Sequence, residues 1–400
     1  MALGNTSTRY GAFSKSFHWL TALLILTLIP LGLFAKNLPY ETQEELARKA
    51  WFFSLHKTLG VTVFVVAFLR ILWALSQPNP GLLNADKKLE SCAAEAVHWL
   101  LYAALVVVPL SGWIGHAAAA GFAPIWWPFG QGLPLIPKNT AIEHAAGAVH
   151  WLGTKILIAT LLLHVAGALK HHVIDRDATL RRMLPGEPAI GPLPDQLHRR
   201  TPEVAALTIW AGVLVIGILL GLSGGSENGA AEAAALEDVA SDWEVQTGTI
   251  AIGVVQFGSE VEGSFADWTA AISFDETVDQ GIAGNVTTTI SIPSLSLGSV
   301  TDQAMGPDFF HASAFPTARF VAEIKTGPDG YLAEGTLSIK DNAVPISLPF
   351  QLTINADTAE IRADTKLDRR DFGIGATMTD ESSLGFGVKV KITLTATRAD

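Results

Sequence analysis

Residues 150–164 have the sequence HWLGTKILIATLLLH, a mostly apolar stretch with a histidine at each end. At 100° per residue, His150 and His164 fall on nearly the same face of a helix, about 21 Å apart along its axis. The surrounding apolar segment, residues 147–170, is long enough to cross a bilayer. Histidine is costly in hydrocarbon and usually serves a function there. The pattern predicts a transmembrane helix with one imidazole near each membrane surface, both facing a bundle interior.

Four more segments are long and apolar enough to cross a bilayer, at residues 17–35, 53–76, 97–118 and 203–222. The first is longer than the apolar core of a signal peptide and contains Pro30, so we interpret it as a retained helix. The fold class is therefore multi-domain. It begins with an all-α transmembrane four-helix bundle over residues 1–185, followed by a cytoplasmic loop and a fifth, tethering helix over residues 186–223.

Basic residues in the flanking loops predict the orientation, because Lys and Arg concentrate on the cytoplasmic side. One side has Arg9, Lys15, Lys87, Lys88, Arg176, Arg181, Arg182, Arg199 and Arg200, and the other has Lys36, Arg48, Lys49 and Lys138. The N-terminus is therefore expected in the cytoplasm, and five spans place the rest of the chain outside. Residues 1–223 have 17 Lys+Arg and 12 Asp+Glu, whereas residues 224–400 have 10 and 26. This asymmetry indicates two solvents, and we expect no nucleic-acid partner.

Two further histidines open predicted helices at matching depths. His18 begins the first segment on the cytoplasmic side, and His56 begins the second on the outer side. Their expected depths in the membrane pair His18 with His164 and His56 with His150. Cys92 is the only cysteine, so covalent haem attachment and thiolate clusters are excluded. Two imidazoles on one iron suit electron transfer, and bundles commonly hold such groups between facing helices, so we predict two non-covalent haem groups.

Other polar residues in the first half leave alternatives open. His98 shares the depth of His18, and spacing alone does not exclude it as a ligand. His171 and His172 lie at a helix margin and are expected to face water or lipid headgroups. Arg70, at the cytoplasmic end of the second segment, is interpreted either as the partner of a haem propionate or as a cation that extends to the interface.

After residue 240 the hydrophobic period changes from helical to two. Apolar residues alternate with polar ones over 346–354 and 388–394, and more briefly over 320–324. Short alternating strands separated by Gly, Pro and Asp predict an antiparallel barrel or sandwich over residues 241–398. Residues 224–240 are small, acidic and polar, which is typical of a flexible linker.

Several motifs in the first half support a family resemblance. They are Phe17-His18-Trp19-Leu20, Leu55-His56-Lys57, His150-x13-His164, His171-His172 and Asp177-Ala-Thr-Leu-Arg-Arg-Met-Leu-Pro185. Through them, residues 9–185 resemble the bacterial cytochrome b561 family of the inner membrane. The resemblance implies haem b on His18/His164 and on His56/His150, and makes His98 a non-ligand. It also implies electron exchange with quinones, and one family activity is superoxide oxidation coupled to quinone reduction. The fifth helix departs from the family.

The second half has motifs of a different family. They are Val261-Glu-Gly-Ser-Phe-x-x-Trp268, Ile272-Ser-Phe-Asp275, Asp308-Phe-Phe-His-Ala-Ser-Ala-Phe-Pro-Thr-Ala-Arg-Phe320 and Asp368-Arg-Arg-Asp-Phe-Gly-Ile-Gly375. This half resembles the YceI family of exported, lipocalin-like proteins. The resemblance implies an eight-stranded periplasmic barrel with a cavity for an isoprenoid chain, in some members a polyprenyl quinone. Phe257, Trp268 and Phe320 are expected to line that cavity, although barrel aromatics are packing residues by default.

These observations predict a membrane-bound dihaem b-type cytochrome that transfers electrons between a quinone/quinol pool and an unidentified redox partner. Its periplasmic domain would bind a polyprenyl quinone or another isoprenoid lipid. Three alternatives remain: a lipid carrier anchored by the cytochrome without redox coupling, a superoxide-to-quinone oxidoreductase, and a redox sensor or structural bundle without turnover. We expect no catalytic side chain beyond the haem ligands.

Overall fold

The computed structural model describes residues 2–40, 42–119, 123–191, 193–194, 196, 200–224, 236, 241–327 and 330–399. The chain divides into two compact units, and we describe each by itself. The first contains most of the helical region, and the second contains the strands together with the short segments Pro39–Ala50 and Ala119–Pro124. Arg199 and nearly all of the expected linker over residues 224–240 lie outside the described residues.

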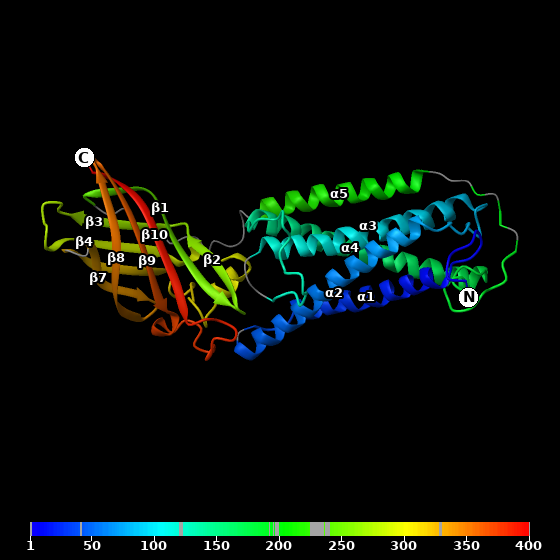
Figure 1. Cartoon of the computed structure of the whole chain (residues 1–400), viewed down its shortest axis with the longest axis horizontal. Helices are drawn as coiled ribbons and strands as arrows, with labels where there is room; N and C mark the ends of the chain where they lie inside the picture. Colours follow the sequence, from blue (N-terminus) through cyan, green and yellow to red (C-terminus); the bar gives the residue numbers. More distant parts are fainter. Residues whose placement is uncertain are drawn as a thin grey trace. The chain divides into compact units, whose positions relative to one another are not determined.

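Five helices build the first unit and are visible in Figure 1: α1 (Ala12–Lys36), α2 (Gln43–Leu75), α3 (Lys88–Ala118), α4 (Thr140–Lys170) and α5 (Thr201–Gly224). Each contains a stretch that is long and apolar enough to cross a membrane, which confirms the prediction of five apolar helices. The helices begin before the apolar segments do. In α2, for example, residues 43–50 include five polar side chains and favour helix, so the helix begins before its apolar segment.

The fifth helix packs into the bundle and contributes to its core. Trp210 of α5 is only 3 % exposed, and its indole N–H donates a hydrogen bond of 3.1 Å to the carbonyl of Leu100 in α3. Gly217 and Gly221 lie against α4 so closely that a Cβ on Gly217 would approach Val149 to 2.7 Å. Small residues four apart are a common device for close helix contact in membranes. The helix is therefore more than the tether that we expected.

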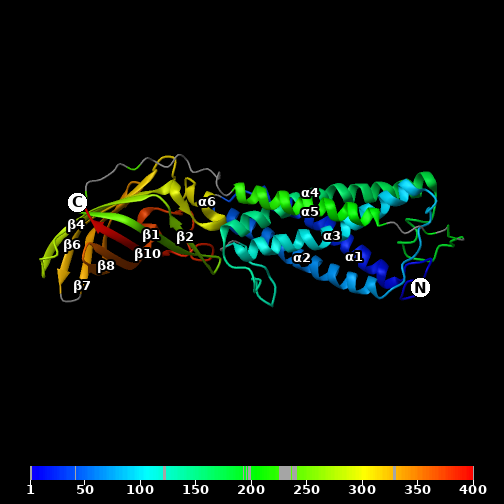
Figure 2. The ribbon, with the colours of Figure 1, turned by 90° about the horizontal axis from the view of Figure 1, so that it is seen from above.

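The second unit is one antiparallel sheet of ten strands with a short helix, α6 (Thr301–Met305). The strands are β1 (Trp243–Gln256), β2 (Ser259–Phe265), β3 (Trp268–Phe274), β4 (Gly281–Ser291), β5 (Leu295–Ser296), β6 (Thr317–Gly327), β7 (Gly330–Ile339), β8 (Asn342–Asn355), β9 (Thr358–Asp368) and β10 (Gly387–Arg398). Their order in the sheet is β3-β4-β6-β7-β8-β9-β10-β1-β2-β5. Figure 2 shows the curl of this sheet.

The sheet curls because one stretch of chain changes partners midway. β2 pairs with β1 at one end of the sheet, and after two residues the chain continues as β3, which pairs with β4 at the other end. The bend is fixed by backbone hydrogen bonds from Ala266 to Ser294 and from Ser291 to Asp267. If β2 and β3 are taken as one bent strand and the two-residue β5 is set aside, eight long strands remain. The expected lipocalin-like architecture is confirmed.

Candidate functional site

Two histidine rings from α2 and α4 face each other inside the bundle. The ring centroids of His56 and His150 are 6.4 Å apart, and their planes are almost perpendicular, at 87°. His150 Nδ1 lies 2.8 Å from the carbonyl oxygen of Val108 in α3. A hydrogen bond donated by Nδ1 leaves Nε2 free as a ligand atom, which is the usual arrangement for a metal-bound histidine. His56 Nδ1 is buried and has no hydrogen-bond partner in the described part of the chain.

Glycines make room for these two rings. A Cβ on Gly32 of α1 would lie 2.7 Å from His56 Cε1, and a Cβ on Gly112 of α3 would lie 2.9 Å from His150 Nδ1. Neither distance occurs in real structures without displacement, so any larger residue at these positions would push the rings away. Gly32 and Gly112 therefore help to shape the site, although no motif in the sequence singled them out.

A second group of histidines lies near the other end of α4. The ring centroids of His18 and His164 are 6.1 Å apart, and those of His98 and His164 are 5.1 Å apart. Metal–imidazole bonds are about 2 Å long, so two imidazoles on opposite sides of one metal ion have ring centroids roughly 6 Å apart. Both predicted pairs match that spacing, whereas the His98–His164 distance is too short for it. The donor atoms and their spacing thus fit a bis-histidine haem at both positions.

Arg70 belongs to this second group. Its guanidinium carbon lies 5.6 Å from the ring centroid of Tyr102, and Tyr102 in turn stacks on His98. Arg70 is close enough to His18 and His164 to interact with them electrostatically. Within the described residues, no carboxylate forms an ion pair with Arg70. Its charge is therefore free to meet an anionic group, which is what the propionate interpretation requires.

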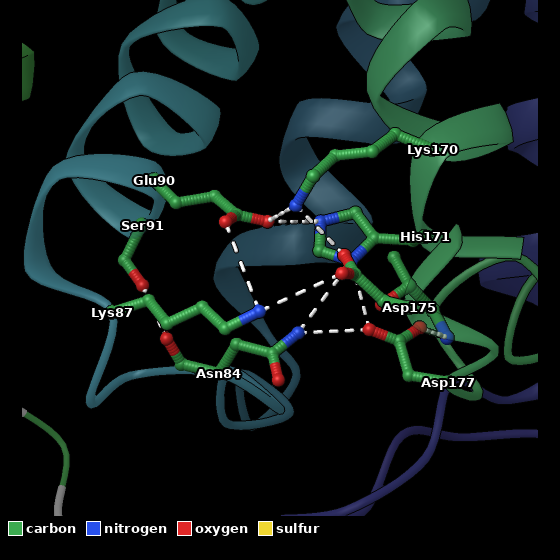
Figure 3. A network of polar contacts seen from close by, with 9 residues as sticks. Asn84, Lys87, Glu90, Ser91, Lys170, His171, Asp175 and Asp177 are labelled. Carbon is green, nitrogen blue, oxygen red and sulfur yellow. Dashed lines mark hydrogen bonds and ion pairs between the residues drawn. The ribbon is translucent and has the colours of Figure 1, made fainter.

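We expected His171 to face water or lipid headgroups, but its side chain is largely buried. It lies in a short π-helix, His171–Asp175, that follows α4, and its side chain is only 13 % exposed. Figure 3 shows its ring between three carboxylates, with Nδ1 2.8 Å from Asp177 and Nε2 3.3 Å from Glu90. The wider π turn changes the direction of the side chain, which periodicity counted at 3.6 residues per turn does not anticipate. His172 is exposed, as expected.

Two of these three carboxylates, Glu90 and Asp175, form ion pairs with lysine. Lys170 Nζ lies 2.5 Å from Glu90 and 2.8 Å from Asp175, and Lys87 lies 3.6 Å from Asp175 (Figure 3). Glu90, His171 and Asp175 are close enough to one another to hold a cation. Because two ammonium groups already pair with Glu90 and Asp175, we interpret the network as a link between α3 and the end of α4.

Apolar side chains enclose a long cavity inside the curled sheet. Two compartments of about 150 Å³ each adjoin one another, because they share the lining residues Ile250, Ile290, Leu337, Leu367 and Val390. A smaller compartment of about 30 Å³ shares Ile272, Ile324, Phe350 and Ile361 with the second. A narrow, almost entirely apolar space of this kind accommodates one slender hydrocarbon chain.

Two of the three aromatic residues predicted to line the cavity do so. Trp268 and Phe320 line the second compartment. Phe257 does not line any of these compartments. It lies in the turn between β1 and β2 with a left-handed φ of 46°, and packs against a cluster that includes Phe309 and Met378. The alternation of a strand sets side-chain direction only within the strand, so it does not apply to this turn residue.

A buried arginine lines the first compartment of the cavity. Arg369 is 3 % exposed, and burial lowers the pKa of its guanidinium. All five of its N–H groups donate to backbone carbonyls, those of Ile374, Gly375, Met378, Leu384 and Gly385. This explains the motif over residues 368–375, since the arginine holds the loop between β9 and β10 in place.

Comparisons with known proteins identify relatives of the helical unit. Residues 9–186 match the family model described as prokaryotic cytochrome b561. The chain is 32 % identical over 188 residues to "Cytochrome b561 homolog 2" of Escherichia coli (strain K12), covering 46 % of this chain and 95 % of that protein. It is 26 % identical over 181 residues to "Probable superoxide oxidase CybB" of Yersinia pestis, covering 44 % of this chain and 96 % of that protein.

The sheet unit has relatives of its own. Residues 243–396 match the model of the YceI-like domain. Among solved structures, BcnA of Burkholderia cenocepacia is 28 % identical and covers 39 % of this chain and 100 % of its own, with a TM-score of 0.36. A polyisoprenoid binding domain from Saccharophagus degradans is 13 % identical and covers 40 % and 100 %, with a TM-score of 0.32. The chain belongs to the prokaryotic cytochrome b561 family, membrane electron-transfer proteins with haem b, and carries a YceI-like domain after its five helices.

Proposed function

We propose that this protein is a dihaem b-type cytochrome that transfers electrons between a quinone/quinol pool and a redox partner. The observation that carries the proposal is the presence of two facing histidine pairs, His18/His164 and His56/His150, with ring centroids 6.1 and 6.4 Å apart. Because His150 and His164 are separated by about 21 Å along α4, the two sites lie near opposite membrane surfaces and form a two-step relay.

A small set of residues in the helical unit has defined roles in this proposal. The four histidines would hold the iron of two haem groups through their imidazole nitrogens. When bound, haem supplies reversible one-electron chemistry at the iron. The Val108 carbonyl orients the His150 ring, and Gly32 and Gly112 let the neighbouring helices approach the rings. Arg70 balances the charge of a propionate near the His18/His164 pair.

The excess of basic residues in one set of loops supports a cytoplasmic N-terminus in a bacterial inner membrane, with the YceI-like domain in the periplasm. In this arrangement His18 and His164 lie near the inner surface, and His56 and His150 near the outer one. The cavity of the sheet unit suits an isoprenoid chain, and a quinone combines such a chain with a redox-active ring. One unit would thus bind the lipid that the other oxidises or reduces.

The test combines a haem count with a redox titration. The purified full chain is expected to contain two haem b per polypeptide by the pyridine haemochrome assay, and a quinol is expected to reduce both, observed in the haem absorption bands. A colourless protein after expression with ample haem would refute the haem assignment. Haem that no quinol reduces would refute the quinone coupling.

A second candidate function concerns the electron donor. The relative from Yersinia pestis carries the name "Probable superoxide oxidase", which favours superoxide as a donor and quinone as the acceptor. Rapid mixing of the oxidised protein with superoxide distinguishes this function from simple quinol oxidation. Reduction of haem within the mixing time supports it, and haem that stays oxidised counts against it.

A further inference from the structure

Three side chains of the sheet unit bury a polar atom that has no hydrogen-bond partner among the described residues. The atoms are Gln256 Oε1, Ser291 Oγ and Gln303 Nε2. Such atoms are rare in folded proteins, and each requires an explanation, because a buried polar group without a partner costs free energy. Gln256 is only 3 % exposed and Ser291 is fully buried.

Two of these three residues lie on the wall of one compartment. Gln256 is the last residue of β1 and Gln303 lies in α6, and both line the first compartment, whereas Ser291 does not. Arg369 is the only other polar residue in that lining, and the remaining lining residues are hydrophobic. Two amides with unused hydrogen-bonding capacity therefore line the same, otherwise apolar compartment.

Arg369 limits what this compartment can bind. An arginine has five N–H donors, and in Arg369 all five are taken by backbone carbonyls. A phosphate group is normally held by direct, charge-assisted hydrogen bonds from free cationic donors. Neutral amides such as Gln256 and Gln303 instead suit a neutral oxygen, since each amide can both donate and accept a hydrogen bond.

We propose that Gln256 and Gln303 form a subsite for the neutral, oxygen-bearing head group of an isoprenoid ligand, whose tail occupies the adjoining apolar compartments. The head is a quinone ring carbonyl or a free hydroxyl, and it is neither a phosphate nor a bare hydrocarbon end. The inference rests on the proposed lipid-binding function of the sheet unit and deepens it by naming the class of head group.

A ligand subsite and a purely structural role predict opposite changes in melting temperature when either glutamine is replaced. Without ligand the two amides are a cost, so replacing either by methionine, which has nearly the same shape, should raise the melting temperature of the lipid-free protein. The same replacement should weaken binding of a head-bearing lipid by about tenfold, the loss expected for one hydrogen bond. A residue that merely supports the fold would lower the stability instead.

The experiment uses the full haem-containing chain, freed of lipid in detergent, and native mass spectrometry to measure occupancy. The probes are a prenyl quinone, a free prenol of similar length, a prenyl phosphate and the hydrocarbon squalene. The variants are Gln256→Met and Gln303→Met, which are independent of each other in case one fails to fold. Ser291→Ala is the matched control, because it removes an equally orphaned polar atom outside the cavity lining.

In the wild-type chain we expect quinone or prenol to bind about tenfold or more tightly than squalene and prenyl phosphate. Gln256→Met and Gln303→Met should abolish that preference and leave squalene binding unchanged, and Ser291→Ala should retain it. Comparison of the quinone and prenol arms identifies the head. Equal binding of squalene, tightest binding of the phosphate, or unchanged preference in both glutamine variants would overturn the subsite. Squalene binding and quinol reduction of haem would then still support the proposed function separately.

Discussion

The two units of this protein build their sites in opposite ways. In the helical unit, four imidazoles in two facing pairs define the proposed haem sites, and all four share the task of an iron ligand. In the sheet unit, the cavity is enclosed by many aliphatic side chains of similar character, and only Gln256, Gln303 and Arg369 in the first compartment are polar. A ligand held by bonds therefore depends on single residues, whereas a ligand held by exclusion of water depends on a shape that many residues share.

The largest expected effect is the loss of one haem from the helical unit. His150→Ala removes one ligand of the pair with His56, so the haem count should fall from two to one per chain. His98→Ala should leave two haems, because the rings of His98 and His164 lie too close together for both to hold one iron. A pyridine haemochrome assay of each variant measures the count. Two haems in His150→Ala, or one in His98→Ala, would contradict the assignment.

The next effect concerns the stability of the bundle. Trp210→Ala should destabilise the helical unit by about 3–5 kcal/mol, the usual cost of removing a large buried aromatic residue. Loss of Soret absorbance on heating measures it. Leu207→Ala, at a position of α5 that is 68 % exposed, is the control and should change the melting temperature little. If both variants melt like the wild type, α5 is only a tether.

A smaller effect is expected when the cavity is filled. Leu337 lines both large compartments, and Leu337→Trp should lower the occupancy of a bound isoprenoid by about tenfold, because the indole takes the place of the chain. Val321→Trp, on the neighbouring strand β6 at a position that is 44 % exposed, should leave the occupancy unchanged. Native mass spectrometry compares the two. Equal occupancy would show that the ligand lies elsewhere.

The smallest effect is a pH dependence in the sheet unit. Hydrogen bonds from Arg370 lower the pKa of Asp368 from 3.8 to about 2. Since the carboxylate is stabilised in the folded state, its contribution is complete above about pH 4 and is lost as the pH falls towards 2. As the pH falls through this window, the free energy of unfolding should decrease less in Asp368→Asn than in the wild type. The difference should be about 1 kcal/mol at most, because the pair is partly exposed. A steeper acid transition in the variant would refute the assignment.

The histidine pairs could be predicted because helix geometry converts a spacing in sequence into a depth in the membrane. A histidine in hydrocarbon also needs a functional reason, which singled these residues out. The apolar segments and the alternation in residues 346–354 likewise follow from local periodicity. Gly32 and Gly112 could not be predicted, since their role depends on how neighbouring helices are rotated about their axes. The direction of His171 depends on a π turn, which leaves no pattern in the sequence.

In the sheet unit, too, features that depend on contacts between residues far apart in the sequence could not be predicted. The change of partner between β2 and β3 depends on contacts of Ala266 and Asp267 with residues 291 and 294, about 25 positions away. Gln256 and Gln303 are 47 positions apart, and only the folded sheet brings both to one wall. The Gly217-x-x-x-Gly221 pattern of α5 was available from the sequence and would have predicted close packing.

Ser241 and Asp242 affect how this domain avoids unwanted association. The Ser241 hydroxyl accepts from the backbone N–H of Ile272 at 2.8 Å, and the Asp242 N–H donates to the Ile272 carbonyl at 2.9 Å. These bonds satisfy the middle of β3, which would otherwise be an open edge able to recruit strands from other molecules. The residues just before β1 thus cover part of this edge, which leaves less free backbone for a strand of another molecule.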